Sequence, residues 1–307
     1  VRFWGYELEL TTRNIVKKNF SWESKLVLSY QQNKVLKLPD NGIAKNRTGG
    51  IALGDGTFFG GIAEGEPLNR FYGYVATGII ETEEQAANAN YDALSRLPQK
   101  GAKRVGDYEW AARNGDGQIT TADQFCLGVT VPPFTGGLQN SFRLKNWTLS
   151  LYLDWATGHS IFDESYSRYF YGTFTNNYAL AKDVLKAWKK PGDKTKYAKF
   201  YANDSNWGND NYNRRATNTF TYKGDYLCLR DVSLSWSLPK AWLRKLHISD
   251  VTLTVSGNTL CYWTAVHGVS PEAATTGGLY TASSTYDTGF SPYPPTRKVL
   301  FTAKLTF

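Results

Sequence analysis

Seven segments of this chain alternate apolar and polar residues with a period of two, and this pattern constrains the fold more than any other feature. Segment 147–155 shows it most clearly, with Trp147, Leu149, Leu151, Leu153 and Trp155 on one face and Thr148, Ser150, Tyr152 and Asp154 on the other. The other six segments are 3–10, 20–30, 134–144, 232–238, 251–257 and 299–307. Alternation of this kind is typical of β-strands with two unlike faces. The sequence therefore predicts an all-β protein.

The two faces of these strands favour a particular environment. The polar face is rich in Ser, Thr and Gln, whereas an ordinary solvent-facing surface carries more charge. Aromatic residues stand at strand ends, as Trp147 and Trp155 do. An apolar band flanked by two aromatic girdles is typical of a transmembrane barrel. We expect the face of Leu151 to contact lipid and the face of Ser150 and Asp154 to line a lumen. The alternative is a soluble sandwich or barrel whose aromatics fill a core.

The connections between the segments alternate in length. Short ones lie at 16–19, at Lys145 and Asn146, and in the sequence "PKAWLRKLHIS", whereas long excursions cover 33–132, 159–221 and 265–295. Barrels of the outer membrane have short periplasmic turns and long outer loops. The excursions are therefore expected on one side, where they would form an extracellular vestibule.

Two features inside the excursions predict local structure. Residues 70–80 look like a further strand with 102–110 as its partner, which makes seven or nine crossings. Thr82 precedes Gln85 by three residues, an arrangement typical of a helix-capping box. The segment 180–188 has an apolar stripe at helical spacing, formed by Leu180, Val184, Leu185 and Trp188. We expect that stripe to pack on its own loop in preference to forming a ligand platform.

Composition argues against several other classes of function. The formal net charge is +8, but the basic residues are scattered, so nucleic-acid binding is not indicated. Cys126, Cys228 and Cys261 are widely spaced without a CxxC motif, which argues against a metal site. The three histidines, His159, His247 and His267, lie in different segments without a nucleophile motif. No enzyme is predicted.

One short motif, "NGDGQITTAD", resembles a calcium-binding loop. With Gly117 at the sixth position, oxygen ligands would come from Asn114, Asp116, the Gln118 carbonyl, Thr120 and Asp123. Ala112 stands where the first carboxylate is required, and Asp123 is shorter than the usual final Glu. A tight turn held by Asx-type hydrogen bonds is the alternative. We expect an empty or weak calcium site.

Several segments together resemble the C-terminal part of SusC/RagA-type TonB-dependent outer-membrane transporters of Bacteroidetes. They are "GEPLNRFYGYVATGIIET", "GDYEWAARNGDGQITTADQFCLG", "PPFTGGLQNSFRLKNWTLSLYLDWATGHSIFD", "GDYLCLRDVSLSWSLPKAWLRKL", "VTLTVSGNTLCYW" and "YPPTRKVLFTAKLTF". The resemblance implies the C-terminal part of a large, 22-stranded antiparallel transmembrane β-barrel whose long extracellular loops carry short helices. Residues 1–307 would form one portion of that barrel domain, and the plug domain and TonB box would lie outside these residues. This chain would be a fragment or one part of a split protein. The family often has an acidic residue where Ala112 stands.

The resemblance also implies a function. It is nutrient uptake, in which oligosaccharides, glycans or peptides cross the bacterial outer membrane with energy delivered through TonB. The partners would be TonB, a SusD-like surface lipoprotein and outer-membrane lipid. Phe307 matches the terminal aromatic that resembles the signal read by the barrel-assembly machinery of outer-membrane proteins. Two alternatives remain, a passive porin-like channel and a surface β-rich glycan-binding module. The substrate-binding residues are not identified.

Overall fold

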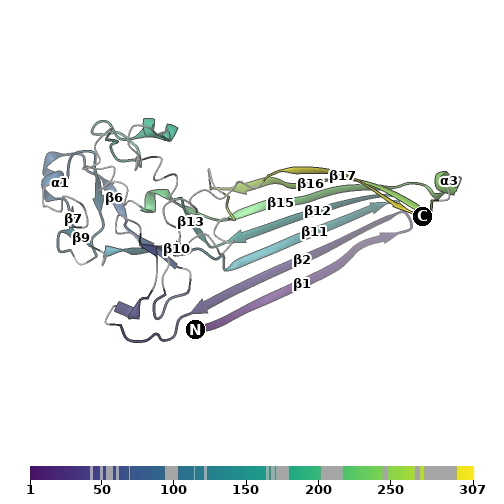
Figure 1. The fold of residues 1–307 in the computed structure, drawn as a ribbon, viewed down its shortest axis with the longest axis horizontal. Helices are drawn as coiled ribbons and strands as arrows, with labels where there is room; N and C mark the ends of the chain where they lie inside the picture. Colours follow the sequence, from purple (N-terminus) through teal and green to yellow (C-terminus); the bar gives the residue numbers. More distant parts are fainter. Residues whose placement is uncertain are drawn as a thin grey trace.

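The central element is a seven-stranded antiparallel sheet, seen in the computed structural model (Figure 1). Its order is β1 (Arg2–Lys17), β2 (Phe20–Lys34), β11 (Phe134–Leu144), β12 (Trp147–Thr157), β15 (Tyr226–Ser237), β16 (Asp250–Thr264) and β17 (Lys298–Thr306). The structure describes residues 1–41, 44–48, 51–52, 58–59, 62–68, 70–93, 103–113, 115–120, 123–163, 166, 170, 180–201, 217–244, 248–266, 270–272 and 296–307. All seven strands predicted from the alternation are confirmed. No described helix is long and apolar enough to cross a membrane.

The register of the sheet collects the apolar residues on one face. Leu149 lies opposite Phe142 of β11 and opposite Leu234 of β15, and Leu234 lies opposite Val255 of β16. Because strand side chains alternate with a period of two, a slip of one residue would move an entire apolar set to the other face. Large side chains on this face remain exposed, including Trp147, Leu234 and Val255. A continuous uncovered apolar surface marks a site of interaction with lipid or protein.

Aromatic pairs mark both ends of the apolar face. Near the short turns Trp147 stacks on Trp236, with ring centroids 5.4 Å apart. At the other end Tyr30 packs against Phe134 at 4.5 Å. Trp147 and Trp155 are eight residues apart, which corresponds to roughly 20 Å of height for a strand tilted by about 40°. This spacing fits the apolar band of an outer-membrane barrel, which is about 25 Å tall.

A few polar side chains interrupt the apolar face, and they bond to one another. The Oγ of Ser24 donates to the amide oxygen of Asn140 at 2.6 Å, and the indole Nε1 of Trp22 donates to the same oxygen at 3.0 Å. Asn14, where the register between β1 and β2 shifts, donates to Ser24 at 2.7 Å. Polar groups in lipid must find partners within the protein, and this network satisfies that requirement.

The opposite face of the sheet is polar and charged. Lys25 pairs with Glu9 at 2.7 Å, and Arg13 lies 3.5 Å from Glu23. The two faces therefore differ as predicted, with the face of Leu151 apolar and the face of Ser150 and Asp154 polar.

The connections fall at opposite ends of the sheet according to their length (Figure 1). Residues 18–19 join β1 to β2, Lys145 and Asn146 join β11 to β12, and residues 238–249 with the short helix α3 (Lys240–Leu243) join β15 to β16. The short turns also bond to their neighbours, because the Lys145 amide donates to the Asn19 carbonyl and the Ser237 amide donates to the Asn146 carbonyl. The described parts of the long excursions lie at the other end.

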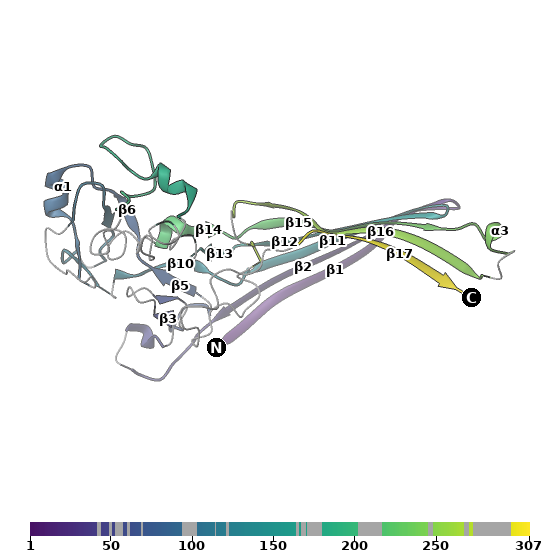
Figure 2. The same cartoon turned by 45° about the horizontal axis from the view of Figure 1, so that its top comes forward.

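The first and second excursions fold together into one body beyond the sheet (Figure 2). Its short strand pairs are β5 (Arg70–Gly73) with β10 (Phe125–Val129), β6 (Ala76–Ile79) with β8 (Tyr108–Trp110), and β13 (Ser160–Phe162) with β14 (Thr221–Lys223). One buried cluster holds it together, made of Tyr74, Tyr108, Trp110, Ile119, Phe162, Phe170, Ala187, Tyr197, Ala198 and Phe220. The aromatic residues of this cluster therefore form the core of the loop body.

The expectation that 70–80 and 102–110 cross the membrane is wrong. β6 and β8 do pair antiparallel, but they contain four and three residues, and they lie in the loop body outside the main sheet. A transmembrane strand needs about 9–11 residues. The described residues therefore contain seven crossings.

The predicted loop helices are present but shorter than their sequence segments. Helix α1 spans Glu83–Asn88 and has the expected capping box between Thr82 and Gln85. Segment 180–188 contains only a 3₁₀ helix, η3 (Lys182–Lys186). Its Trp188 is buried against Gly106 of the first excursion, whereas Leu185 is 70% exposed. The stripe therefore packs partly on a neighbouring excursion instead of only on its own loop.

A lysine at Leu151 tests which face of the sheet meets lipid. Leu151 lies midway between Trp147 and Trp155, so Leu151→Lys should destabilise the protein in a bilayer, lowering its free energy of unfolding by about 2–4 kcal/mol. Ser150→Lys, one residue away on the polar face, is the matched control and should cost much less. The measurement is denaturant unfolding of the full-length protein in lipid vesicles. Equal losses for the two variants would contradict the assignment of faces.

Candidate functional site

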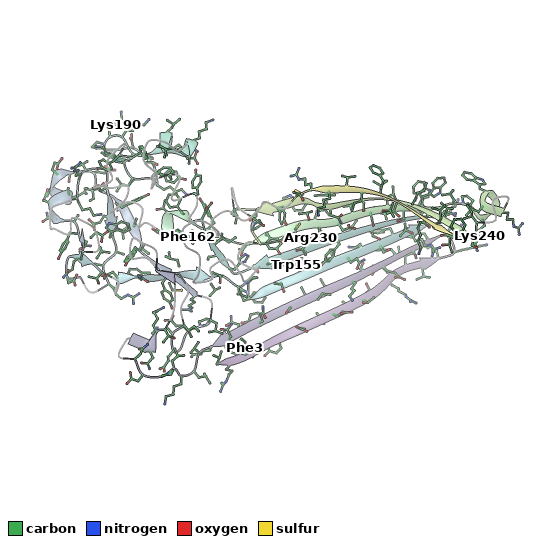
Figure 3. All side chains as sticks on the ribbon, viewed as in Figure 1. Phe3, Trp155, Phe162, Lys190, Arg230 and Lys240 are labelled. Atoms are coloured by element: carbon green, nitrogen blue, oxygen red, sulfur yellow. The ribbon has the colours of Figure 1, made fainter. Side chains whose placement is uncertain are left out.

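A charged cluster lies on the polar face where the sheet meets the loop body, near the labelled Arg230 of Figure 3. The Arg230 guanidinium donates to both carboxylate oxygens of Asp154, from Nε at 2.7 Å and from Nη2 at 2.8 Å. It also donates to Glu272, the second acidic partner. A bidentate pair of this kind has a strict geometry as well as a strong attraction. The positions of these three side chains, at the end of the sheet next to the loop body, are therefore fixed relative to one another.

A β-bulge aims Arg230 toward this cluster. In the pairing of β12 with β15, Tyr152 lies opposite Asp231 and Leu153 lies opposite Leu229, which leaves Arg230 without a ladder partner. The pairing of β15 with β16 shifts at the same place. Bulges re-aim side chains and are common at barrel rims and functional sites.

Tyrosines complete the cluster and connect it to the third excursion. Tyr262 of β16 donates from its hydroxyl to Glu272 at 2.6 Å, and Arg230 donates to the same hydroxyl at 3.3 Å. Tyr226 donates to Asp154 at 3.4 Å. Because Glu272 belongs to the third excursion, its bonds to Arg230 and Tyr262 attach the start of that excursion to β15 and β16.

His159 makes a second attachment nearby, just beyond the end of β12. Its Nε2 lies 3.1 Å from the Pro271 carbonyl, and its side chain is 2% exposed. Burial lowers the pKa of His159, although the Pro271 carbonyl and Asp225 act in the opposite direction. The ring is therefore neutral at pH 7, with Nε2 donating to the carbonyl. A Cβ at Gly224 would lie 2.3 Å from Nε2, so only glycine fits beside the ring.

These contacts hold Pro271 and Glu272, at the start of the third excursion, against the strands of the sheet. Pro271 is bonded by His159, and the adjacent Glu272 is bonded by Arg230 and Tyr262. Arg230, Tyr262 and Glu272 bond to one another, which suits a structural latch, whereas the buried Nδ1 of His159 has no hydrogen-bond partner among the described residues. The cluster and His159 can therefore fix the described start of the third excursion to the sheet.

The predicted calcium loop is described in part. Asn114 lies outside the described residues. The Asp123 carboxylate is fully buried and accepts from the Arg113 amide at 2.8 Å, the Thr120 amide at 2.9 Å and the Thr120 hydroxyl at 3.0 Å. Asp116 is exposed and accepts from the Gln118 amide at 2.9 Å, which is an Asx turn. Within the described part of the chain, no group of three or more His, Cys, Asp or Glu residues could hold a metal ion.

Other residues singled out in the sequence have these positions. Asp154 is on the polar face, as predicted, and belongs to the cluster. Phe307 follows β17 and is 85% exposed. The three cysteines are free. His247 and His267 lie outside the described residues.

Sequence reasoning missed the role of Arg230, although a signal was present. In "YLCLRDVSLSW" the apolar positions are Leu227 and Leu229 before Arg230, and Val232 and Leu234 after it. The parity therefore changes at Arg230, as it must when one extra residue enters a strand.

Comparisons with known proteins agree with the fold. No protein-family model matches the sequence. TonB-dependent receptor P3 of Formosa agariphila is 29% identical over 275 residues, covering 88% of this chain and 25% of that protein. TonB-dependent receptor P39 of the same organism is 27% identical over 307 residues, covering 89% of this chain and 28% of that protein.

Solved structures give the same result at lower sequence identity. The RagAB peptide transporter has a TM-score of 0.69 and 17% identity, covering 99% of this chain and 29% of that chain. The RagAB peptide importer in the closed-closed state has a TM-score of 0.68, also with 17% identity.

The resemblance to TonB-dependent receptors is therefore confirmed over most of this chain, which spans roughly a quarter of the length of those relatives. Such receptors are outer-membrane β-barrel proteins, and the sheet is the corresponding portion of the barrel fold. These similarities also confirm the location predicted from the sequence, which is the bacterial outer membrane. The relatives are receptors and transporters, which agrees with the prediction of a protein that is not an enzyme.

Removal of the Arg230 guanidinium tests the latch. Arg230→Met leaves the half-buried carboxylates of Asp154 and Glu272 facing each other, and should lower the stability of the mouth by about 1.5–3 kcal/mol. Arg143→Met, on the same face near the short turns, is the control and should have little effect. Hydrogen–deuterium exchange of the peptide containing Pro271 and Glu272 measures the difference. Unchanged protection in Arg230→Met would rule out the latch.

Proposed function

We propose that the protein carrying this chain imports an oligomeric nutrient, an oligosaccharide or a peptide, across the outer membrane with energy supplied through TonB. The observation that carries this proposal is the similarity to TonB-dependent receptors over most of the chain. The sheet supports it physically, because its two faces and its alternating connections suit a wide barrel with an outer vestibule.

The open edges of the sheet support its place in a larger barrel. β1 and β17 are the edge strands, and each pairs with a single neighbour among the described residues. In lipid an unpaired backbone edge is strongly unfavourable. We infer that other strands of the full protein pair with both edges.

The vestibule also suits a lid protein. The loop body is ordered by its own aromatic core, so it presents a firm surface at the outer end of the barrel. On that body Leu185 is 70% exposed and Leu180 is 41% exposed, in a segment otherwise anchored by the buried Trp188. We propose a SusD-like surface lipoprotein as the partner, with this segment among its contacts.

Two alternative functions are less well supported. A surface glycan-binding module in water would have to cover its apolar face, and here Trp147, Leu234 and Phe301 remain exposed. A passive porin-like channel shares the barrel but needs neither a plug nor TonB. The dependence of uptake on TonB therefore separates the channel from the importer.

We propose that the loop of Asp116 and Asp123 binds calcium weakly or not at all. The hydrogen bonds of Asp123 indicate a structural role, since its carboxylate already accepts three donors. Asp123→Asn should therefore destabilise the loop body equally with and without calcium. Asp116→Asn should leave thermal unfolding unchanged in both conditions. A midpoint that rises with micromolar calcium in the wild type and not in Asp116→Asn would contradict this expectation.

Deletion of the TonB box tests the proposed import. Cells with the deletion should lose growth on one particular glycan or peptide source while retaining growth on its monomers, because a wide plugged barrel opens only with energy from the inner membrane. The measurement is growth on a panel of glycans and peptides, and a full-length complement is the control. Normal uptake of the oligomer without TonB would favour the passive channel.

A further inference from the structure

A groove on the apolar face lies close to the short-turn end of the sheet. It has a volume of about 390 Å³ and crosses β12, β15, β16 and β17. Its lining includes Trp147, Trp236, Leu253, Val255, Phe301 and Ala303. All of these side chains belong to the face that meets lipid, so the groove opens toward acyl chains.

Two indole rings, those of Trp147 and Trp236, line the groove, and a third indole packs against Trp236. Trp147 stacks on Trp236, and Trp242 of α3 meets Trp236 edge-on with ring centroids 6.0 Å apart. Trp242 is 62% exposed. Indole rings concentrate at the level of lipid headgroups. The groove therefore begins at the headgroup level and extends toward the middle of the bilayer.

The turn that carries Trp242 is basic. Lys240 and Arg244 are exposed on and directly after α3, and Figure 3 shows Lys240 at the end of the sheet opposite the loop body. The sequence of the turn, 238–249, contains three basic residues and no acidic residue. Exposed cations next to an apolar groove at headgroup level complement a lipid phosphate.

We propose that this groove and the basic turn bind one anionic glycerophospholipid of the periplasmic leaflet. One acyl chain lies in the groove, and the phosphate lies beside Lys240 and Arg244. The net negative charge of the lipid provides selectivity, because a zwitterionic headgroup carries a cation that the basic turn repels. This inference rests on the proposed function only for its orientation, in which the short turns face the periplasm.

The first test measures selectivity for the headgroup. Full-length protein in zwitterionic detergent is titrated with phosphatidylglycerol or phosphatidylcholine, and bound lipid is counted by native mass spectrometry. The wild type should prefer phosphatidylglycerol. Lys240→Ala combined with Arg244→Ala should weaken that binding about thirtyfold, since each basic residue near such a charge contributes about 1 kcal/mol. Binding of phosphatidylcholine should not change.

A matched variant controls for charge. Lys17→Ala combined with Lys18→Ala removes two cations at the turn between β1 and β2, away from the groove, and should leave phosphatidylglycerol binding unchanged. Equal weakening by both double variants would show a diffuse attraction to the basic rim and would overturn the proposal. A wild type without preference between the two lipids would overturn it too.

The second test blocks the acyl chain. Ala303→Trp places an indole in the groove and should reduce binding of both lipids, while heat-modifiable migration on gels confirms that the barrel has folded. Unreduced binding of phosphatidylglycerol in folded Ala303→Trp would also contradict the site. TonB-dependent uptake is assayed in parallel. The uptake assay tests the import proposal and the lipid-binding assay tests the lipid site, so either proposal can fail without the other.

Discussion

The backbone of a chain in lipid must satisfy all of its hydrogen bonds internally, and the rest of this structure depends on that constraint. Seven antiparallel strands meet it with hydrogen-bonded ladders that only a few bulges interrupt, and their register keeps the apolar side chains on one face. The polar groups that do fall on this face, such as Asn140 and Ser24, bond to each other. The connections then have to lie outside the bilayer, with turns at one end and excursions at the other.

The long excursions, at the other end of the sheet, are held by packing and by contacts with the strands. In the described residues, buried aromatic side chains of the first and second excursions form a shared core, so these two excursions pack together. The Arg230 cluster and His159 then attach the third excursion to the wall. A strand bulge at the mouth provides the attachment without disturbing the lipid-facing side below it.

At the end of the sheet with the short turns, indole rings and basic side chains add to the contact that the apolar face makes with the membrane. The indoles of Trp147, Trp236 and Trp242 form a border between groove and turn. A barrel with loops as large as these requires a firm position in the bilayer, and an anionic lipid held beside Lys240 would stabilise that position. The two ends of the sheet thus differ in chemistry, with a basic turn and indole rings at one end and a loop body with an aromatic core at the other.

The sequence alone determined the strands, their faces and the side on which the long excursions lie, because period-two alternation is a local property that any strand in lipid must show. It also indicated the capping box at Thr82. Only the tertiary structure decided that β6 and β8 are short loop strands and that Arg230 reaches Asp154. It alone joined His159 to Pro271, which is 112 residues away in the chain. Such contacts depend on which distant segments the barrel brings together, and a periodic pattern carries no information about that.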